Sequence, residues 1–443
     1  MVEVANFFSK SVTVFYARRD CRVLEENGEP GGTRTRDHRI KSAMLYQLSY
    51  RPVSALLHFQ GSIHFRVLET FRNRRNPCFG VLMNRSANRT RKPVRPLPLL
   101  GKIAVTGAAV YAVRKLASRK LPGEKNTPQE QQQAAFWHSK VVLITGGSRG
   151  LGLALGHEFG ARGCRLAICA RDEEELNEAC QRLSEKGIEA VPFVSDISHR
   201  SEAEQLIERV VQHFGRLDVL VNNAGEIQVA PLNALTHGDF ESAMNLMFWA
   251  PVNLSLAALP YLAAEKSGRI VNITSIGGRV SVPHLLPYSC AKFACVGFST
   301  GLAAEVKSRG VHVLTVVPGL MRTGSYLNAK FGGKAKDEFT WFGLLGNLPG
   351  LSTSASSAAH DVISALEKKQ YNCTISLPAK LLVGAETFLP NTTRTIMSYI
   401  NAVLPSAQGH TQKYPGKALD SQMNSVFEAF TSLGKKAASA YNE

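Results

Sequence analysis

Three side chains near the middle of the chain have the types and spacing needed to move a proton at an oxygen atom. Tyr288 and Lys292 are four residues apart, so on a helix their side chains share one face. A tyrosine hydroxyl has an ordinary pKa of about 10, and a neighbouring ammonium group lowers that pKa because it favours the phenolate. Ser275, thirteen residues before the tyrosine, can hydrogen-bond an oxygen on which charge develops.

A tyrosine–lysine pair alone is more often an ordinary surface pair of a helix. Together with Ser275, a glycine-rich turn earlier in the chain favours a catalytic pair instead. The segment TGGSRGLG, residues 145–152, lies between the apolar run VVLIT and a helical pattern. Glycines there let the backbone approach a pyrophosphate, whose charge is met by free N–H groups and by the positive end of the helix. This placement predicts a dinucleotide site, with the candidates Thr145, Gly146, Ser148, Arg149, Gly150, Leu151 and Gly152.

The end of the next apolar run, RLAICA at 165–170, bears on the choice of cofactor. An acidic residue there would bond the ribose 2′-hydroxyl of NAD, whereas this chain has Ala170 followed by Arg171. Arg149 adds a second cation, and two guanidinium groups favour a 2′-phosphate. We therefore expect NADP(H) to be preferred and NAD(H) to remain usable. The competing interpretation is that Arg171 is a solvated arginine ahead of an acidic run.

The elements that position these residues follow an alternating pattern. Apolar runs rich in β-branched residues alternate with amphipathic segments, which predicts a parallel sheet covered on both faces. We therefore expect an α/β fold, a doubly wound, Rossmann-like parallel sheet in a single catalytic domain. The expected strands are 141–145, 165–170, 190–194, 217–221, 269–274, 311–317 and 373–377.

Five motifs resemble those of the short-chain dehydrogenase/reductase family, of the NADP-preferring type, over residues 140–377. They are TGGSRGLG, NNAG ending at Gly225, ITS ending at Ser275, YSCAK starting at Tyr288, and PG at 318–319, in the family's order and spacing. The resemblance implies a Rossmann-type oxidoreductase that transfers a hydride between a nicotinamide and a carbonyl or hydroxyl group. It also implies a homo-oligomer.

The resemblance assigns further roles to single residues. Tyr288 would protonate the carbonyl oxygen, Ser275 would position that oxygen, and Lys292 would also hold the nicotinamide ribose. Asp196 would contact the adenine and Thr323 would close over the nicotinamide carboxamide, although each could be an ordinary loop or capping residue. The remaining cofactor residues expected on this basis are Ile197, Asn223, Ala224, Gly225, Pro318 and Gly319.

One position departs from the family pattern. The family has an asparagine in the helix before the catalytic serine. In AMNLMFWAPVN of this chain, the matching position is Met247. That asparagine helps to hold a water that links the lysine to solvent, and a methionine thioether accepts hydrogen bonds only weakly. Asn245 lies two residues away and could substitute only after a register change such as a π-bulge. We expect reduced turnover. The alternative is an NADP-binding scaffold or sensor with weak or no turnover.

Residues 325–360 form an insertion that corresponds to the family's variable substrate lid. Its apolar residues predict a hydrophobic, lipid-like carbonyl substrate, and the equally plausible interpretation is that they only pack the lid on the sheet. The apolar residues concerned are Phe339, Trp341, Phe342, Leu344 and Leu345.

Charge and composition divide the chain. Residues 1–140 carry 25 Lys and Arg against 9 Asp and Glu, and the remainder carries 27 against 26, so the net charge of +17 is concentrated in the first third. The later residues lack a basic stripe interleaved with aromatics, which argues against a nucleic-acid partner. The eight cysteines form no CxxC pair and no zinc-type spacing with histidine, so we expect no metal and an intracellular protein.

The expected organisation has five parts. Residues 1–95 are a basic extension, either disordered, or a targeting sequence, or an artefact of the gene start. Residues 96–120 are an apolar helix with basic flanks, either a membrane anchor or a helix packed on its own domain. Residues 121–139 are a linker and 140–377 the dehydrogenase/reductase domain. Residues 378–443 are helices that could cover the pocket, contact a membrane or form a dimer face, followed by a flexible tail from about Ala407.

Overall fold

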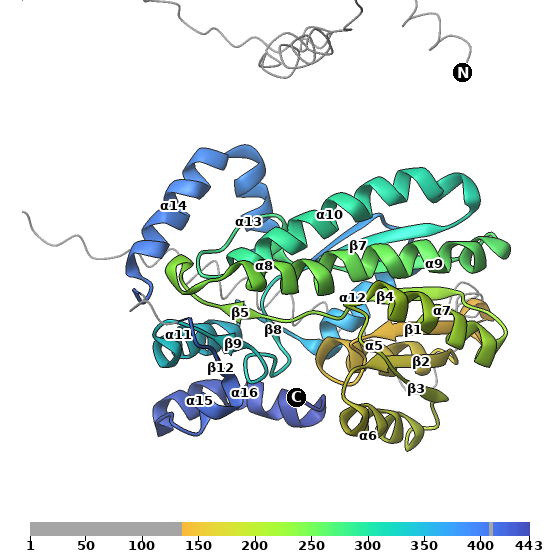
Figure 1. The fold of residues 1–443 in the computed structure, drawn as a ribbon, viewed down its shortest axis with the longest axis horizontal. Helices are drawn as coiled ribbons and strands as arrows, with labels where there is room; N and C mark the ends of the chain where they lie inside the picture. Colours follow the sequence, from red (N-terminus) through yellow and green to blue (C-terminus); the bar gives the residue numbers. More distant parts are fainter. Residues whose placement is uncertain (1–134, 407–410) are drawn as a thin grey trace, which may run out of the picture. The chain divides into compact units, whose positions relative to one another are not determined.

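The computed structural model of the chain describes residues 135–406 and 411–443. The expected basic extension, the helix at 96–120 and most of the linker lie outside the described residues. Within them, a seven-stranded sheet is flanked by helices (Figure 1). This is the doubly wound, Rossmann-like architecture that the alternating pattern predicts.

The sheet is parallel throughout and its strand order is β11-β7-β6-β4-β1-β2-β3. The chain therefore starts in the middle, winds outward to β3, and crosses back to β4, so the carboxyl ends of β1 and β4 lie side by side at the switch point. The strands are β1 (Val141–Thr145), β2 (Arg165–Ala170), β3 (Ala190–Val194), β4 (Val219–Asn222), β6 (Arg269–Ile273), β7 (His312–Pro318) and β11 (Asn372–Ile375).

Two apolar cores cover the two faces of the sheet. One face packs on α5 (Gly150–Gly160), α6 (Glu173–Ser184) and α12 (Ala355–Glu367), and the other on α7 (Arg200–Phe214), α9 (Ala250–Ala264) and α10 (Leu286–Val306). In α6, buried Leu176, Ala179, Cys180 and Leu183 recur at helical spacing, and Asp172 caps the first turn by accepting from the Glu175 amide at 2.9 Å.

The helical stretch His237–Ala264 is long and apolar enough to cross a membrane, with a mean hydropathy of 1.4. It consists of α8 (His237–Met244), the π-helical segment η3 (Asn245–Trp249) and α9. Leu254, Ala258 and Leu262 of α9 are fully buried against the sheet. Part of its apolar surface therefore covers the sheet, while Trp249 and Leu256 on the same stretch are exposed.

The remaining elements carry the lid and the last part of the chain. Two small sheets join β8 (Met321–Arg322) to β10 (Thr353–Ser354), and β5 (Gln228–Val229) through β9 (Lys330–Phe331) to β12 (Tyr414–Pro415). The other helices are η2 (Leu232–Ala234), η4 (Ile276–Gly278), η5 (Lys307–Arg309), α11 (Ala335–Asn347), α13 (Leu377–Phe388), α14 (Pro390–Val403), α15 (Gly416–Asp420) and α16 (Ser425–Ala440).

Two expectations about the ends of the domain are wrong. Trp137, placed in the linker, is only 1% exposed and packs edge-to-face on Phe159, so the domain begins before residue 140. The end of the chain, expected to be flexible from about Ala407, instead forms β12, α15 and α16 over its described part. The polar composition of this segment did not indicate a packed helix, because α16 buries only a narrow stripe that includes Phe427 and Thr431.

Candidate active site

The glycine turn joins the carboxyl end of β1 to α5. Neighbouring backbone atoms leave no space for a side chain at Gly146 or Gly152. Gly146 has a φ of +59°, and a Cβ there would lie 2.8 Å from Ala224 Cα. A Cβ on Gly152 would collide with the carbonyl oxygen of Gly146. The turn therefore requires glycine at both positions, as expected of a backbone that must approach a diphosphate closely.

Thr145 and Asn223 hold the turn against the end of β4. The Thr145 hydroxyl donates to Val221 O at 3.2 Å and accepts from the Asn223 amide at 3.0 Å. The Asn223 side chain donates to the carbonyl oxygens of Thr145 and Gly146, both at 2.9 Å. These bonds fix the distance between the two strand ends, so Asn223 supports the turn and also lines the cavity beside it.

A cavity of about 490 Å³ lies outside the carboxyl ends of the strands. The structure brings most of the predicted cofactor residues to its wall, together with Tyr288 and Lys292. Those that line it are Gly146, Ser148, Arg149, Gly150, Leu151, Arg171, Ile197, Asn223, Ala224, Gly225, Tyr288, Lys292 and Thr323.

Six predicted site residues are not among those that line the cavity: the catalytic candidate Ser275 and five cofactor candidates. Thr145 and Gly152 shape the turn from below. Asp196 is not part of the wall, although its neighbours Ser195 and Ile197 are. Pro318 and Gly319 also lie outside the wall, where the Gly319 amide donates to Ile375 O at 3.2 Å and ties β7 to β11.

Tyr288 and Lys292 project from α10 as the spacing predicts. The Lys292 ammonium is buried, with the residue 4% exposed, and it donates to Ile273 O at the end of β6 at 2.9 Å. Ser275 lies two residues after the end of β6, and its hydroxyl hydrogen-bonds Tyr288 and accepts from the Gly277 amide at 3.0 Å. All three side chains thus meet at the carboxyl end of β6.

The pKa of Tyr288 differs from the expectation. Burial raises the pKa of its hydroxyl, and the hydrogen bond with Ser275 opposes that rise without cancelling it. The Lys292 ammonium lies 5.8 Å from the centre of the tyrosine ring and is turned toward Ile273 O. Burial also lowers the pKa of Lys292. The predicted lowering of the tyrosine pKa by the lysine is therefore wrong, because burial has the largest effect on the hydroxyl and the ammonium is directed at Ile273 O.

Met247 and Lys292 both approach Gly225 from their own helices. The residue is 2% exposed, and its sulfur and the Lys292 Nζ lie 3.5 and 3.7 Å from the point where a Cβ on Gly225 would be. The helix does contain a π-helical segment at this place, in which the Ala250 amide donates to Asn245 O. The register change does not bring Asn245 inward, because its side chain stays exposed.

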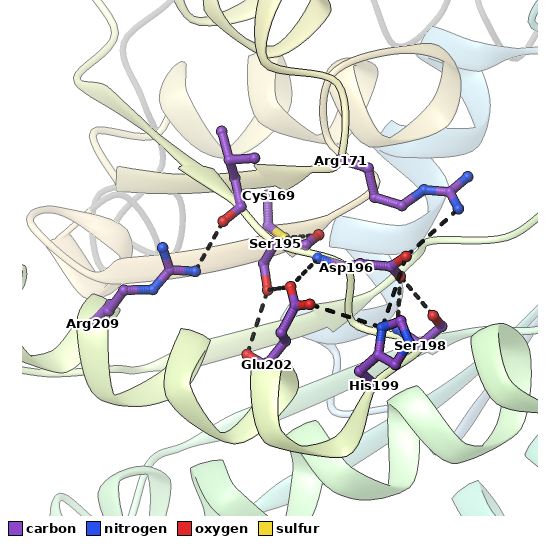
Figure 2. A network of polar contacts seen from close by, with 9 residues as sticks. Cys169, Arg171, Ser195, Asp196, Ser198, His199, Glu202 and Arg209 are labelled. Carbon is purple, nitrogen blue, oxygen red and sulfur yellow. Dashed lines mark hydrogen bonds and ion pairs between the residues drawn. The ribbon is translucent and has the colours of Figure 1, made fainter.

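The two arginines expected to share a phosphate are held apart in different ion pairs. Arg149 pairs with Glu175 at 2.8 Å, while Arg171 is 60% exposed and lies 3.9 Å from Asp196. Figure 2 shows Arg171 directed at the Asp196 carboxylate, which also accepts from Ser198 at 2.7 Å. Burial by itself raises the pKa of Asp196, but the bonds from Ser198 and the charges of Arg171 and His199 outweigh it and hold the pKa below its usual value.

The lid residues pack on one another. Phe339 is fully buried between Phe331 and Phe427, and none of the five apolar lid residues lines the cavity. Tyr288 itself packs against this apolar cluster. The lid is tied to the loop before Tyr288 by His284, whose Nδ1 lies 2.8 Å from the buried Glu338 carboxylate. This pair was missed, since nothing in the sequence links two residues so far apart.

Several cavity residues were also missed because they come from the lid and from the end of the chain. Asn328 and Lys330 reach the cavity from the segment around β9, and Glu443 reaches it from the end of α16. Glu226 lies beside them and pairs with Lys330 at 2.6 Å. Glu226 directly follows the NNAG motif, and this position is a signal that the sequence offers. Asn328, Lys330 and Glu443 adjoin none of the five motifs.

Comparison with known proteins agrees with this geometry. Residues 140–330 match the family model described as short chain dehydrogenase. The chain is 36% identical to a tropinone reductase homologue of Arabidopsis thaliana, over 44% of this chain and 73% of that protein. It is 32% identical to dehydrogenase/reductase SDR family member 7B of Danio rerio, over 52% and 75%.

A solved short-chain dehydrogenase from Streptomyces avermitilis superimposes with a TM-score of 0.51 at 27% identity, covering 60% of this chain and 98% of that one. The parallel sheet, the glycine turn at its switch point and the extensive similarity to these relatives lead to one conclusion: the chain belongs to the short-chain dehydrogenase/reductase family of NAD(P)-dependent oxidoreductases.

Proposed function

We propose that the protein is an NADPH-dependent carbonyl reductase, or the alcohol dehydrogenase of the reverse reaction, with Ser275, Tyr288 and Lys292 as its catalytic residues. The observation that carries the proposal is that Tyr288 and Lys292 border the same cavity as the glycine turn. A nicotinamide cofactor bound there supplies or accepts the hydride.

The three side chains have distinct tasks in this proposal. Because its pKa is raised, the Tyr288 hydroxyl is protonated at neutral pH and can donate a proton to a carbonyl oxygen. Ser275, already bonded to Tyr288, orients that oxygen. Lys292 keeps N–H groups available beyond its bond to Ile273 O, and these are suited to ribose hydroxyls.

Preference for NADPH rests on Arg171. Its guanidinium is mostly exposed just after β2, and among the described residues its ion pair is the long one to Asp196, so it can turn toward a 2′-phosphate. Arg149 is less available, since Glu175 holds it at 2.8 Å. A hydrophobic substrate is supported by the apolar cluster against which Tyr288 packs, which includes Ile227 and Val282.

A carbonyl panel tests the proposal. The purified protein should oxidise NADPH in the presence of apolar ketones or aldehydes, with kcat/KM for NADPH at least about tenfold above that for NADH, the value expected of one hydrogen bond to a charged group. Turnover restricted to small polar ketones would contradict the hydrophobic substrate, and equal use of both cofactors would contradict the role of Arg171. Binding of NADPH without turnover of any member would favour the scaffold.

The presence of methionine at position 247 favours the scaffold. Replacing Met247 distinguishes an active reductase from an NADP-binding scaffold. Met247→Asn should raise kcat by up to about tenfold, or at most about 1.4 kcal/mol of barrier, because an amide beside Lys292 restores a polar path for the returning proton. Met247→Leu is the matched control and should leave kcat unchanged. Steady-state kcat of the two variants, measured at saturating NADPH, decides. A wild type that turns over and does not gain from asparagine would refute the relay explanation.

A further inference from the structure

We propose that residues 441–443 form an intrasteric gate that occupies the diphosphate-binding turn and must leave it before the cofactor binds. The inference rests on the proposal that the glycine turn holds the cofactor diphosphate. It goes beyond that proposal by assigning a regulatory part to a segment that no motif includes.

The gate occupies one hydrogen-bond donor of the turn and is anchored beside it. The Gly150 amide, at the amino end of α5, donates to Tyr441 O at 2.8 Å. Asn442 donates to Ser148 O at 3.3 Å and to Glu175 O at 3.2 Å. Free N–H groups at this end of a helix are what bind a phosphate, so the tail and a diphosphate compete for the same amide.

The gate also fills the space above the turn. The Glu443 carboxylate lies against Gly150 so closely that a Cβ on that glycine would collide with it. Asn328 donates to Glu443 Oε2 at 2.6 Å, and Arg149 Nε lies 3.9 Å from the same oxygen. Glu443 is part of the cavity wall, together with Gly150, Thr323 and Ser325. A diphosphate that approached Gly150 would meet this carboxylate first.

The closed arrangement takes up a proton. The pKa of Glu443 is raised to about 7, and burial is the largest cause. The charge of Arg149, the hydrogen bond from Asn328 and the charge of Lys417 lower this pKa, while the charge of Glu175 raises it. A carboxyl group released to water has a pKa of about 4.3. A group whose pKa is higher in the closed state stabilises that state at low pH and ceases to do so as the pH rises through about 7. The gate is therefore tighter at pH 6 than at pH 8.

Titration of NADPH into the full chain, followed by nicotinamide fluorescence, tests the gate. Deletion of residues 441–443 should lower the Kd for NADPH at least about tenfold at pH 6, and by a smaller factor at pH 8. Glu443→Gln keeps the shape of the protonated side chain, so it should bind NADPH like the wild type at pH 6 and more weakly than the wild type at pH 8. Lys436→Ala, on the exposed side of α16, is the control and should match the wild type.

A second variant and a hydrogen-exchange measurement distinguish loss of the gate from a folding defect. Should the deletion impair folding, Asn442→Ala removes two anchoring bonds without shortening the chain and should also lower the Kd. Hydrogen exchange of residues 437–443 should increase when NADPH binds the wild type. Equal Kd values for wild type and deletion, or slower exchange of the tail with NADPH, would overturn the gate while leaving the proposed function intact. Failure of every variant to bind NADPH would overturn both.

Discussion

Replacing Tyr288 with phenylalanine should lower kcat by about 10³-fold, within the range that a positioned general acid contributes. The substitution removes one oxygen atom from a ring that packs against the lid cluster and leaves the ring in place. The bonds of Lys292 to Ile273 O and of the turn to Asn223 do not involve that hydroxyl. We therefore expect the Kd for NADPH to stay within about twofold of the wild type, a change of about 0.4 kcal/mol.

Single-turnover oxidation of bound NADPH by the best carbonyl substrate gives the measurement for this prediction. Tyr399→Phe, on the exposed face of α14, is a matched control and should keep full activity. Activity retained in Tyr288→Phe would mean that another group donates the proton, and loss of NADPH binding would mean that the substitution disturbs the fold.

Gly152→Ala should weaken NADPH binding by about 100-fold or more, since even a displacement of ~1 Å at a site can cost that much. The added methyl group would occupy the position of the Gly146 carbonyl oxygen, so the turn or the first turn of α5 must move. That displacement also breaks the bond between Asn223 and Gly146 O. The effect is one of backbone geometry, because Gly152 itself is outside the cavity wall.

Gly156→Ala, one turn further along α5, is the control for this substitution. Its methyl group would meet Leu183 at 3.5 Å, an ordinary contact, and the helix should gain up to about 1 kcal/mol from the higher helix propensity of alanine. Fluorescence titration with NADPH and thermal unfolding of both variants distinguish the two effects. An equal loss of affinity in the two variants would show that α5 tolerates no added volume, whatever its position.

The sheet and the catalytic side chains were predictable from the sequence because their signals are local. An apolar run between turn residues is a property of consecutive positions, and β1, β2 and β3 have the predicted bounds. The Tyr288–Lys292 spacing determines a shared helix face in the same way. The direction of the tyrosine pKa was not predictable, because it depends on burial by residues from the lid.

The wall of the cavity that faces the lid was not predictable, for a physical reason. The residues concerned touch partners far away in the sequence: Glu338 bonds His284, and Glu443 bonds Asn328. Each contact depends on where the lid and α16 come to rest, which is a matter of tertiary packing. The polar composition after residue 407 suggested flexibility, whereas one stripe of α16 with Phe427 is enough to dock it on Phe339.

The docking of α16 on the lid has a consequence for how the protein matures during synthesis. The glycine turn, β4 and Tyr288 all precede residue 300, whereas β7 and β11 of the sheet follow it, so the catalytic half can form once residue 375 has been synthesised and before α16 is made. Phe339 can pack on Phe427, and β9 can pair with β12, only after residues 414–427 have been synthesised. A nascent chain thus passes through a stage in which its cofactor turn is built and accessible, and the docking of α16 both completes the lid and ends that stage.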